Sequence, residues 1–138
     1  MAITTTTANK VLDYLFGSIA FSNLSTMYMG LSTTQIQPDG TGATEPSTST
    51  AYARIPIVNN KTNWGTASAA SLSNSTAITF PESIASWGTI THVFLAASAT
   101  VGAADIWYFE ALSVPKTVQT STTVQFAIGA ITVSMTNA

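Results

Sequence analysis

Short apolar runs, separated by long connections rich in Ser, Thr and Gly, are the feature that most constrains how this chain can fold. Within the runs, apolar and polar residues alternate: Trp107 and Phe109, for example, have the opposite parity to Tyr108 and Glu110. Such alternation predicts strands with one buried face. The runs are residues 26–33, 51–58, 76–80, 88–98, 105–112 and 123–135. Together they predict an all-β fold, a sandwich or jelly-roll-like barrel of about seven or eight short strands.

Two positions predict irregular strands. Pro56 has no N–H group to donate, so its strand should lie at a sheet edge or contain a bulge. In the last run, apolar residues occupy even positions up to Ile128 and odd positions from Ile131 onward. A one-residue bulge at Gly129 and Ala130 would cause this change of parity, and so would a two-residue hairpin. We favour the hairpin or a sharp bend.

The N-terminal residues predict an extended arm followed by a single helix. Residues 1–7 show no apolar period and predict the arm, and Thr7 can then cap a short helix over residues 8–17. The apolar residues of that helix share one face, and they are Val11, Leu12, Leu15 and Phe16. We expect one domain over residues 1–138, in which residues 26–138 form the β-sandwich or barrel.

The charge content excludes several classes of function. Only 7% of the residues are charged, against about 25% in a typical soluble domain. No two Lys or Arg residues are adjacent, which argues against nucleic-acid binding. A surface with so little charge is prone to self-association, so we expect a homo-oligomer packed against its neighbours. The absence of cysteine excludes thiol catalysis and zinc-thiolate sites.

Neither targeting nor membrane insertion is expected. The first ten residues, "MAITTTTANK", have no basic region before an apolar stretch, so they do not predict a secretory signal. The most apolar window, residues 93–112, is interrupted by Gly102, Asp105 and Glu110, and its halves alternate like strands. It therefore predicts strands and not a transmembrane helix, and no membrane partner is expected.

The stretch "AITFPESIASWGTITHVFL", residues 77–95, contains the only histidine of the chain together with Glu82 and Trp87. His92 shares parity with Ile90 and Phe94, so we expect it to face inward as a hydrogen-bonded packing residue. Glu82 falls in a turn that follows a proline. The stretch therefore predicts a strand, a turn and a second strand, and no acid–base site.

No other group of residues predicts chemistry. Asp105 and Glu110 have opposite parity on one expected strand, so they point to opposite faces and do not form a carboxylate pair. The segment "PDGTG", residues 38–42, lacks the alternating acids of a calcium loop. We expect no catalytic residue, no cofactor and no metal site.

The pattern around two tryptophans is compatible with two different roles. Trp64 and Trp87 each precede Gly-Thr in a loop, where a tryptophan can plug the end of a sandwich or contact another subunit. The residues expected to make contacts come from the arm, from the connection 34–50 and from aromatic residues in loops. They are Thr4, Thr5, Thr6, Asp39, Tyr52 and Trp64.

Five segments, in order, carry a family resemblance. They are "MYMGLSTT" (27–34), "TEPSTSTAYARIPI" (44–57), "NNKTNW" (59–64), "ITFPESIASWGTITHVFLA" (78–96) and "ALSVPKTV" (111–118). The chain resembles a family of small tailed-bacteriophage virion proteins that are commonly labelled tail fibre or minor structural protein. "WGTITH" matches the family pattern at Trp87, Gly88, Thr89, Thr91 and His92, which implies positions that define the fold.

The resemblance implies a non-enzymatic virion component that is made in the host cytoplasm. A fibre usually has a trimeric shaft, so a compact β domain suggests a capsid decoration or cement protein. Such a protein would bind the outer capsid surface and stabilise the head through many modest contacts. The alternative is a tail-tip or tail-fibre component that contacts the host surface. The expected partners are further copies of the chain, as in a trimer, and the major capsid protein or other virion subunits.

Overall fold

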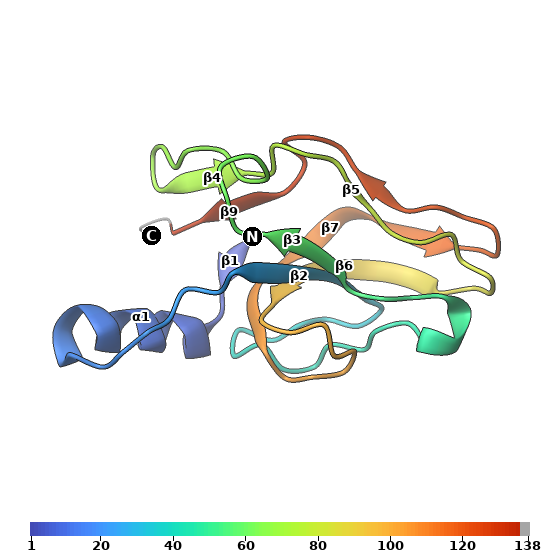
Figure 1. Cartoon of the computed structure of the whole chain (residues 1–138). Coiled ribbons are helices and arrows are strands. Elements are labelled where there is room, and N and C mark those ends of the chain that lie inside the picture. Colours follow the sequence, from blue (N-terminus) through green and yellow to red (C-terminus); the bar gives the residue numbers. More distant parts are fainter. Residues whose placement is uncertain (136–138) are drawn as a thin grey trace.

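The computed structural model describes residues 1–135, and its centre is a five-stranded antiparallel sheet (Figure 1). Its order is β1 (Ala2–Ile3), β7 (Ile106–Val118), β6 (Gly88–Ala96), β2 (Thr26–Ser32) and β3 (Ile55–Val58). Two small sheets pair β4 (Ser71–Ser73) with β9 (Thr132–Ser134), and β5 (Ile78–Thr79) with β8 (Gln125–Phe126). The predicted all-β, sandwich-like fold with one N-terminal helix is confirmed.

The central sheet is covered on both faces. The main core lies between the sheet and the two small sheets, which lie above it in Figure 1, and it joins residues such as Leu95 with Phe80 and Ile131. A second, smaller core contains Ile36 and Phe94, because the connection after β2 crosses the other face. Burial on both sides explains the continuous apolar run at residues 93–96, where every side chain is at most 2% exposed.

Pro56 lies in β3, at one edge of the central sheet, which confirms the expected edge position. Beyond this, β6 contains an irregularity that the sequence pattern did not reveal. The ladder with β7 shifts between Ile90 and His92, whose partners are Lys116 and Ala111. As a result, Ile90 packs into the main core and Phe94 into the second core. The prediction that these residues share one inward face with His92 was therefore wrong, because the alternation of β6 is interrupted where the register of its ladder with β7 shifts.

The N-terminal segment forms a docked edge strand and not a free arm. Strand β1 pairs with β7, and the Thr4 N–H donates to the Trp107 carbonyl at 2.8 Å. The helix α1 runs over Thr5–Gly17 and is capped by Thr4, whose hydroxyl accepts from the Thr7 N–H. The expected arm over residues 1–7 and the helix start near residue 8 were therefore wrong, because Thr4 is fully buried and fixes an earlier cap.

The change of parity near the C-terminus reflects a change of sheet. Strand β8 pairs with β5, whereas β9 pairs with β4, so neither a hairpin nor a one-residue bulge is present. The sharp bend, the other favoured possibility, is confirmed, because the Ala130 N–H closes a turn by donating to the Ala127 carbonyl at 3.0 Å. The Asn74 side chain holds the crossing: it donates to the Ala127 carbonyl at 2.9 Å and accepts from the Ile131 N–H at 2.9 Å. Gly129 takes a φ of 78° in the turn between these two residues.

Candidate contact surfaces

The residues that could have formed a catalytic site do not come together. Glu82 is exposed in its turn, while Trp87 is buried and its Nε1 donates to the Thr50 carbonyl at 3.0 Å. His92 is half-buried, and its Nδ1 lies 2.9 Å from the Thr91 hydroxyl. Within residues 1–135, no group of three His, Asp or Glu side chains could hold a metal ion. No helix in that part of the chain is long and apolar enough to span a membrane.

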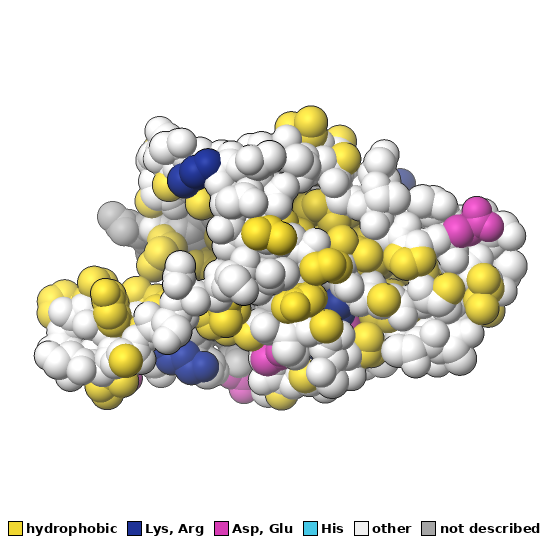
Figure 2. Space-filling view, viewed as in Figure 1, with side chains coloured by type: hydrophobic (Ala, Val, Ile, Leu, Met, Phe, Trp, Pro, Cys, Tyr) yellow, Lys and Arg dark blue, Asp and Glu magenta, His cyan; other side chains and the backbone are white. Residues whose placement is uncertain are grey.

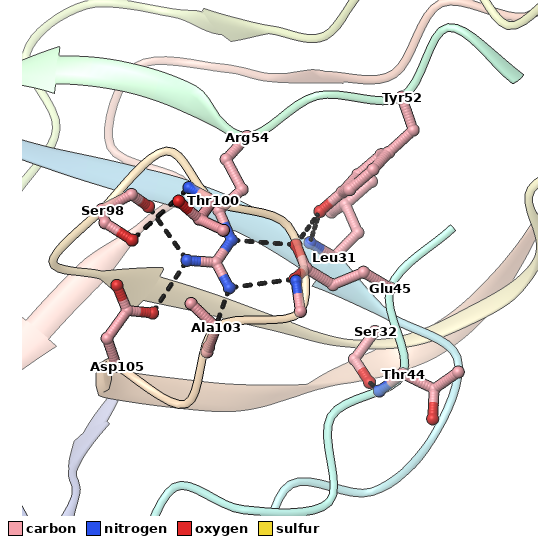
Figure 3. Close-up of polar contacts among 11 residues, drawn as sticks. Leu31, Ser32, Thr44, Glu45, Tyr52, Arg54, Ser98, Thr100, Ala103 and Asp105 are labelled. Atoms are coloured by element: carbon pink, nitrogen blue, oxygen red, sulfur yellow. Dashed lines mark hydrogen bonds and ion pairs between the residues drawn. The ribbon is translucent and has the colours of Figure 1, made fainter. Parts of the chain in front are cut away.

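A buried ionic cluster around Arg54 dominates the polar interior (Figure 3). The guanidinium contacts Glu45 through Nε at 3.0 Å and Nη2 at 2.9 Å, and it contacts Asp105 through Nη1 at 2.8 Å. It also donates to the carbonyl oxygens of Ser98 at 2.9 Å and Ala103 at 3.1 Å. These five contacts match the five N–H donors of an arginine, so the charge is fully satisfied.

The Arg54 cluster fastens three separate segments to one another. Glu45 comes from the connection after β2, Arg54 immediately precedes β3, and Asp105 immediately precedes β7. Glu45 also accepts from the Gly102 N–H at 2.6 Å and from the Tyr52 hydroxyl at 2.8 Å. Burial alone would lower the pKa of Arg54, but its hydrogen bonds to Glu45 and Asp105 and the charges of these two carboxylates hold that pKa above its usual value. The cluster is thus a structural lock.

Three of these residues belong to the "EP…YAR" segment of the sequence. Glu45, Tyr52 and Arg54 are the residues of that segment that meet in the interior, where the guanidinium also lies 5.1 Å from the centre of the Phe94 ring. The sequence could have suggested this cluster, because a lone arginine among apolar residues needs an acidic partner when it is buried. The partners themselves could not be identified from spacing alone.

Tyr52 and Trp64, two of the residues expected to make contacts, are buried. Tyr52 is 2% exposed and packs edge-on against Trp87, with ring centres 5.4 Å apart. Trp64 is 7% exposed, and its Nε1 donates to the Asn59 side chain at 3.0 Å. Burial of Trp64 and Trp87 agrees with their interpretation as core plugs. Tyr52 does not present its ring to solvent, which corrects the expectation that it faces a partner, whereas Trp64 keeps a small exposed fraction that lines a groove.

The other expected contact residues come together at the start of α1. The Thr5 N–H donates to the Pro38 carbonyl at 2.8 Å, and the Thr6 hydroxyl donates to the Asp39 carbonyl at 3.2 Å. Thr5, Thr6 and Asp39 are exposed and form what we call the threonine–Asp39 surface. Hydrogen bonds from Thr41 hold the pKa of the Asp39 carboxyl below its usual value. Thr4 is excluded from this surface because it is completely buried.

Helix α1 exposes the apolar face that the sequence placed on one side. Its only buried residue is Thr7, and Val11 is half-buried. Four side chains form what we call the helix knob: Leu12 is 53% exposed, Leu15 62%, Phe16 85% and Ile19 58%. In Figure 2 the knob is part of the lobe at the left of the molecule, where several hydrophobic side chains are visible. This face stays uncovered because α1 projects past the edge of the sheet (Figure 1).

A groove of about 500 Å³ opens at the root of α1. Its lining includes Val11, Phe21, Trp64, Leu72 and Trp107. Phe21 stacks on Trp107, with ring centres 5.2 Å apart, so the floor is aromatic. Sequence analysis did not identify this groove, because its lining comes from segments that are far apart along the chain.

The comparison with known families gives one match. A family model described as Podophage GP4 fiber I protein gp80 matches residues 2–134. The matched range begins at β1 and ends with β9, so it covers every strand and the helix described above. No curated protein matches the chain.

Proposed function

Because the chain belongs to the podophage GP4 fiber I protein gp80 family, we propose that it serves as a structural component of a phage tail fibre. Membership of this family makes it a virion structural protein. The observation that carries the proposal is a match that spans the whole folded domain. The sequence alone favoured capsid decoration, whereas the description of the family agrees better with the tail-fibre alternative.

The physical properties of the domain support a structural role in the particle. The Arg54 cluster fixes the connections on one side of the sheet, so they are not free to close over a substrate. Every buried side-chain nitrogen or oxygen in residues 1–135 has a hydrogen-bond partner, so no polar side chain in the interior is left unpaired to bind or react with a substrate. We propose that the chain works by contact and not by catalysis.

The contact with other virion subunits is proposed to use the threonine–Asp39 surface. It is exposed and polar, and it is held in place by α1 and by the connection after β2. Host contact through Tyr52 has no support, because its ring is buried, and Trp64 exposes only 7% of its surface. The first matched test is Thr6→Arg against Thr66→Arg, since both threonines are exposed. We expect only Thr6→Arg to reduce incorporation into particles, and equal incorporation of the two variants would exclude this surface.

Capsid decoration remains the second candidate, and one observation favours it. Within residues 1–135 the chain forms one sandwich with one short helix and contains no coiled coil or other shaft. Immunogold labelling of purified particles separates the two functions. Labelling confined to the tail, with few copies per particle, supports the fibre role. Labelling spread over the head, with hundreds of copies, would replace it with decoration.

A further inference from the structure

The helix knob gathers apolar surface that the domain itself leaves uncovered. Among residues 1–135, five of the ten large apolar side chains that are exposed lie between Leu12 and Ile19. Two charged residues, Lys10 and Asp13, are present on the whole of α1. Contiguous exposed patches of this kind mark interaction sites more often than chance surface.

The knob does not fill the groove of its own chain, because none of its four residues belongs to the groove lining. Val11, which does line the groove, lies on the same helix. An α-helix turns about 100° per residue, so Leu12 and Phe16 lie roughly 100° and 140° around the axis from Val11, and only Leu15 lies close to it, at roughly 40°. The two surfaces are both left open within one copy.

The groove suits an apolar occupant. Most of its lining is apolar or aromatic, as at Val11, Phe21 and Leu72. Two polar side chains at its rim already have partners: Asn59 donates to the Leu24 carbonyl at 2.8 Å, and the Asn60 side chain accepts from the Thr62 N–H at 3.0 Å. Phe and Leu side chains would bury apolar area against this lining.

We propose that the helix knob of one copy docks in the groove of a second copy. Both complementary surfaces belong to the same chain, and its net charge of −2 gives little repulsion between copies. The only lysine of the groove lining, Lys61, can face Asp13, which lies next to the knob. This interface goes beyond the role in the particle, because it concerns how the isolated chain assembles.

The available area is at the low end for a specific contact. The four knob side chains, exposed by 53–85%, offer roughly 400–500 Å² of apolar surface. In a two-fold pair each copy buries both its knob and its groove. The pair then buries a total of about 1,000 Å² or slightly more, near the lower limit for specific interfaces. Pairing through the β3 edge is disfavoured, because Pro56 lies on that edge.

The first test measures the mass of the purified chain in solution by light scattering. We expect the wild type to form an oligomer, and Phe16→Asp to shift its dissociation constant at least tenfold toward monomer. The control is Ile128→Asp, since Ile128 is 69% exposed and lies outside both the knob and the groove lining. A monomeric wild type, or equal dissociation of the two variants, would overturn the proposal. Circular dichroism verifies that each variant is folded.

The second test does not depend on disrupting the knob. The natural chain has no cysteine, so single cysteines can be placed without interference. Phe16→Cys protein is mixed with Lys61→Cys protein and treated with a short bismaleimide. We expect this mixture to cross-link far more than a mixture of Ile128→Cys with Lys61→Cys, and equal cross-linking would overturn the proposal. Both tests use the isolated chain, so their failure leaves the fibre assignment intact, and mislocation on particles leaves the interface intact.

Discussion

The Arg54 cluster and the helix knob reverse the usual placement of charged and apolar side chains. In the cluster, three of the chain's ten charged residues are brought together inside the fold. In the knob, side chains such as Phe16, 85% exposed, lie in solvent. The difference indicates two tasks: the cluster holds one copy together, whereas the knob is proposed to hold copies to each other.

Removing Arg54 from the cluster should lower the stability of the fold more than any other substitution considered below. Arg54→Met leaves the carboxylate of Glu45, whose side chain is 3% exposed, buried without its partner. We expect the free energy of unfolding to fall by about 3–5 kcal/mol, as for other broken buried pairs. Denaturant unfolding measures this loss. Lys116→Met is the control at an exposed position, and a loss below about 1 kcal/mol for Arg54→Met would show that the cluster is not a lock.

Removing one hydroxyl of the cluster should have a smaller effect. Tyr52→Phe keeps the ring in the core but leaves the Leu31 N–H, which donates to that hydroxyl at 2.9 Å, without its acceptor. The expected loss is about 1–3 kcal/mol in the free energy of unfolding. Tyr28→Phe serves as control, since Tyr28 is only half-buried. Equal stability of Tyr52→Phe and wild type would contradict the proposed contribution of this hydrogen bond.

The contribution of the Tyr52 hydroxyl to the stability of the fold should also depend on pH in the alkaline range. Burial, together with the charge of Glu45, raises the pKa of Tyr52 well above its ordinary value. The neutral phenol is therefore the form that the fold favours. Its contribution is fully present below the unfolded pKa of about 10 and is lost as the pH rises further. Thermal unfolding between pH 9 and pH 11, roughly the range around that value, should show a steeper loss for wild type than for Tyr52→Phe.

Burial also raises the pKa of Tyr108, so Tyr108→Phe reports the share of the alkaline loss that does not depend on the cluster. If Tyr108→Phe removed the whole alkaline loss and Tyr52→Phe removed none, Tyr52 would not be the group responsible.

Substitution in the knob should have the smallest effect on the fold itself. Phe16 is 85% exposed, so Phe16→Asp should change the free energy of unfolding of the monomer by less than about 0.5 kcal/mol. Unfolding in dilute solution, where copies are dissociated, provides the measurement. A loss of several kcal/mol would mean that the knob packs within its own copy, and the comparison with the Arg54 cluster would fail.

Local patterns predicted much of the sheet. The runs at residues 26–33 and 88–98 became β2 and β6 with nearly the same limits, because long alternating stretches specify strands strongly. Short elements were not predicted: β4, at Ser71–Ser73, has too few apolar residues to show a period. The early start of α1 was not predicted either. Thr4 caps the helix because β1 docks against β7, and this contact is not visible in the local sequence.

The candidate site was less predictable than the fold. Arg54 meets Glu45 nine residues away in sequence and Asp105 fifty-one residues away, and no local pattern encodes such pairs. The helix shows the converse limit. Its apolar face was identified correctly, but sequence periodicity does not indicate whether that face covers the core of its own copy or that of a neighbour.

A cryo-EM map of the intact phage particle tests the central claim most directly. We predict density for this domain in the tail fibre, with α1 of each copy seated against the groove of a neighbouring copy. Copies distributed over the head lattice, with the helix knob facing solvent, would contradict both the fibre assignment and the proposed contact.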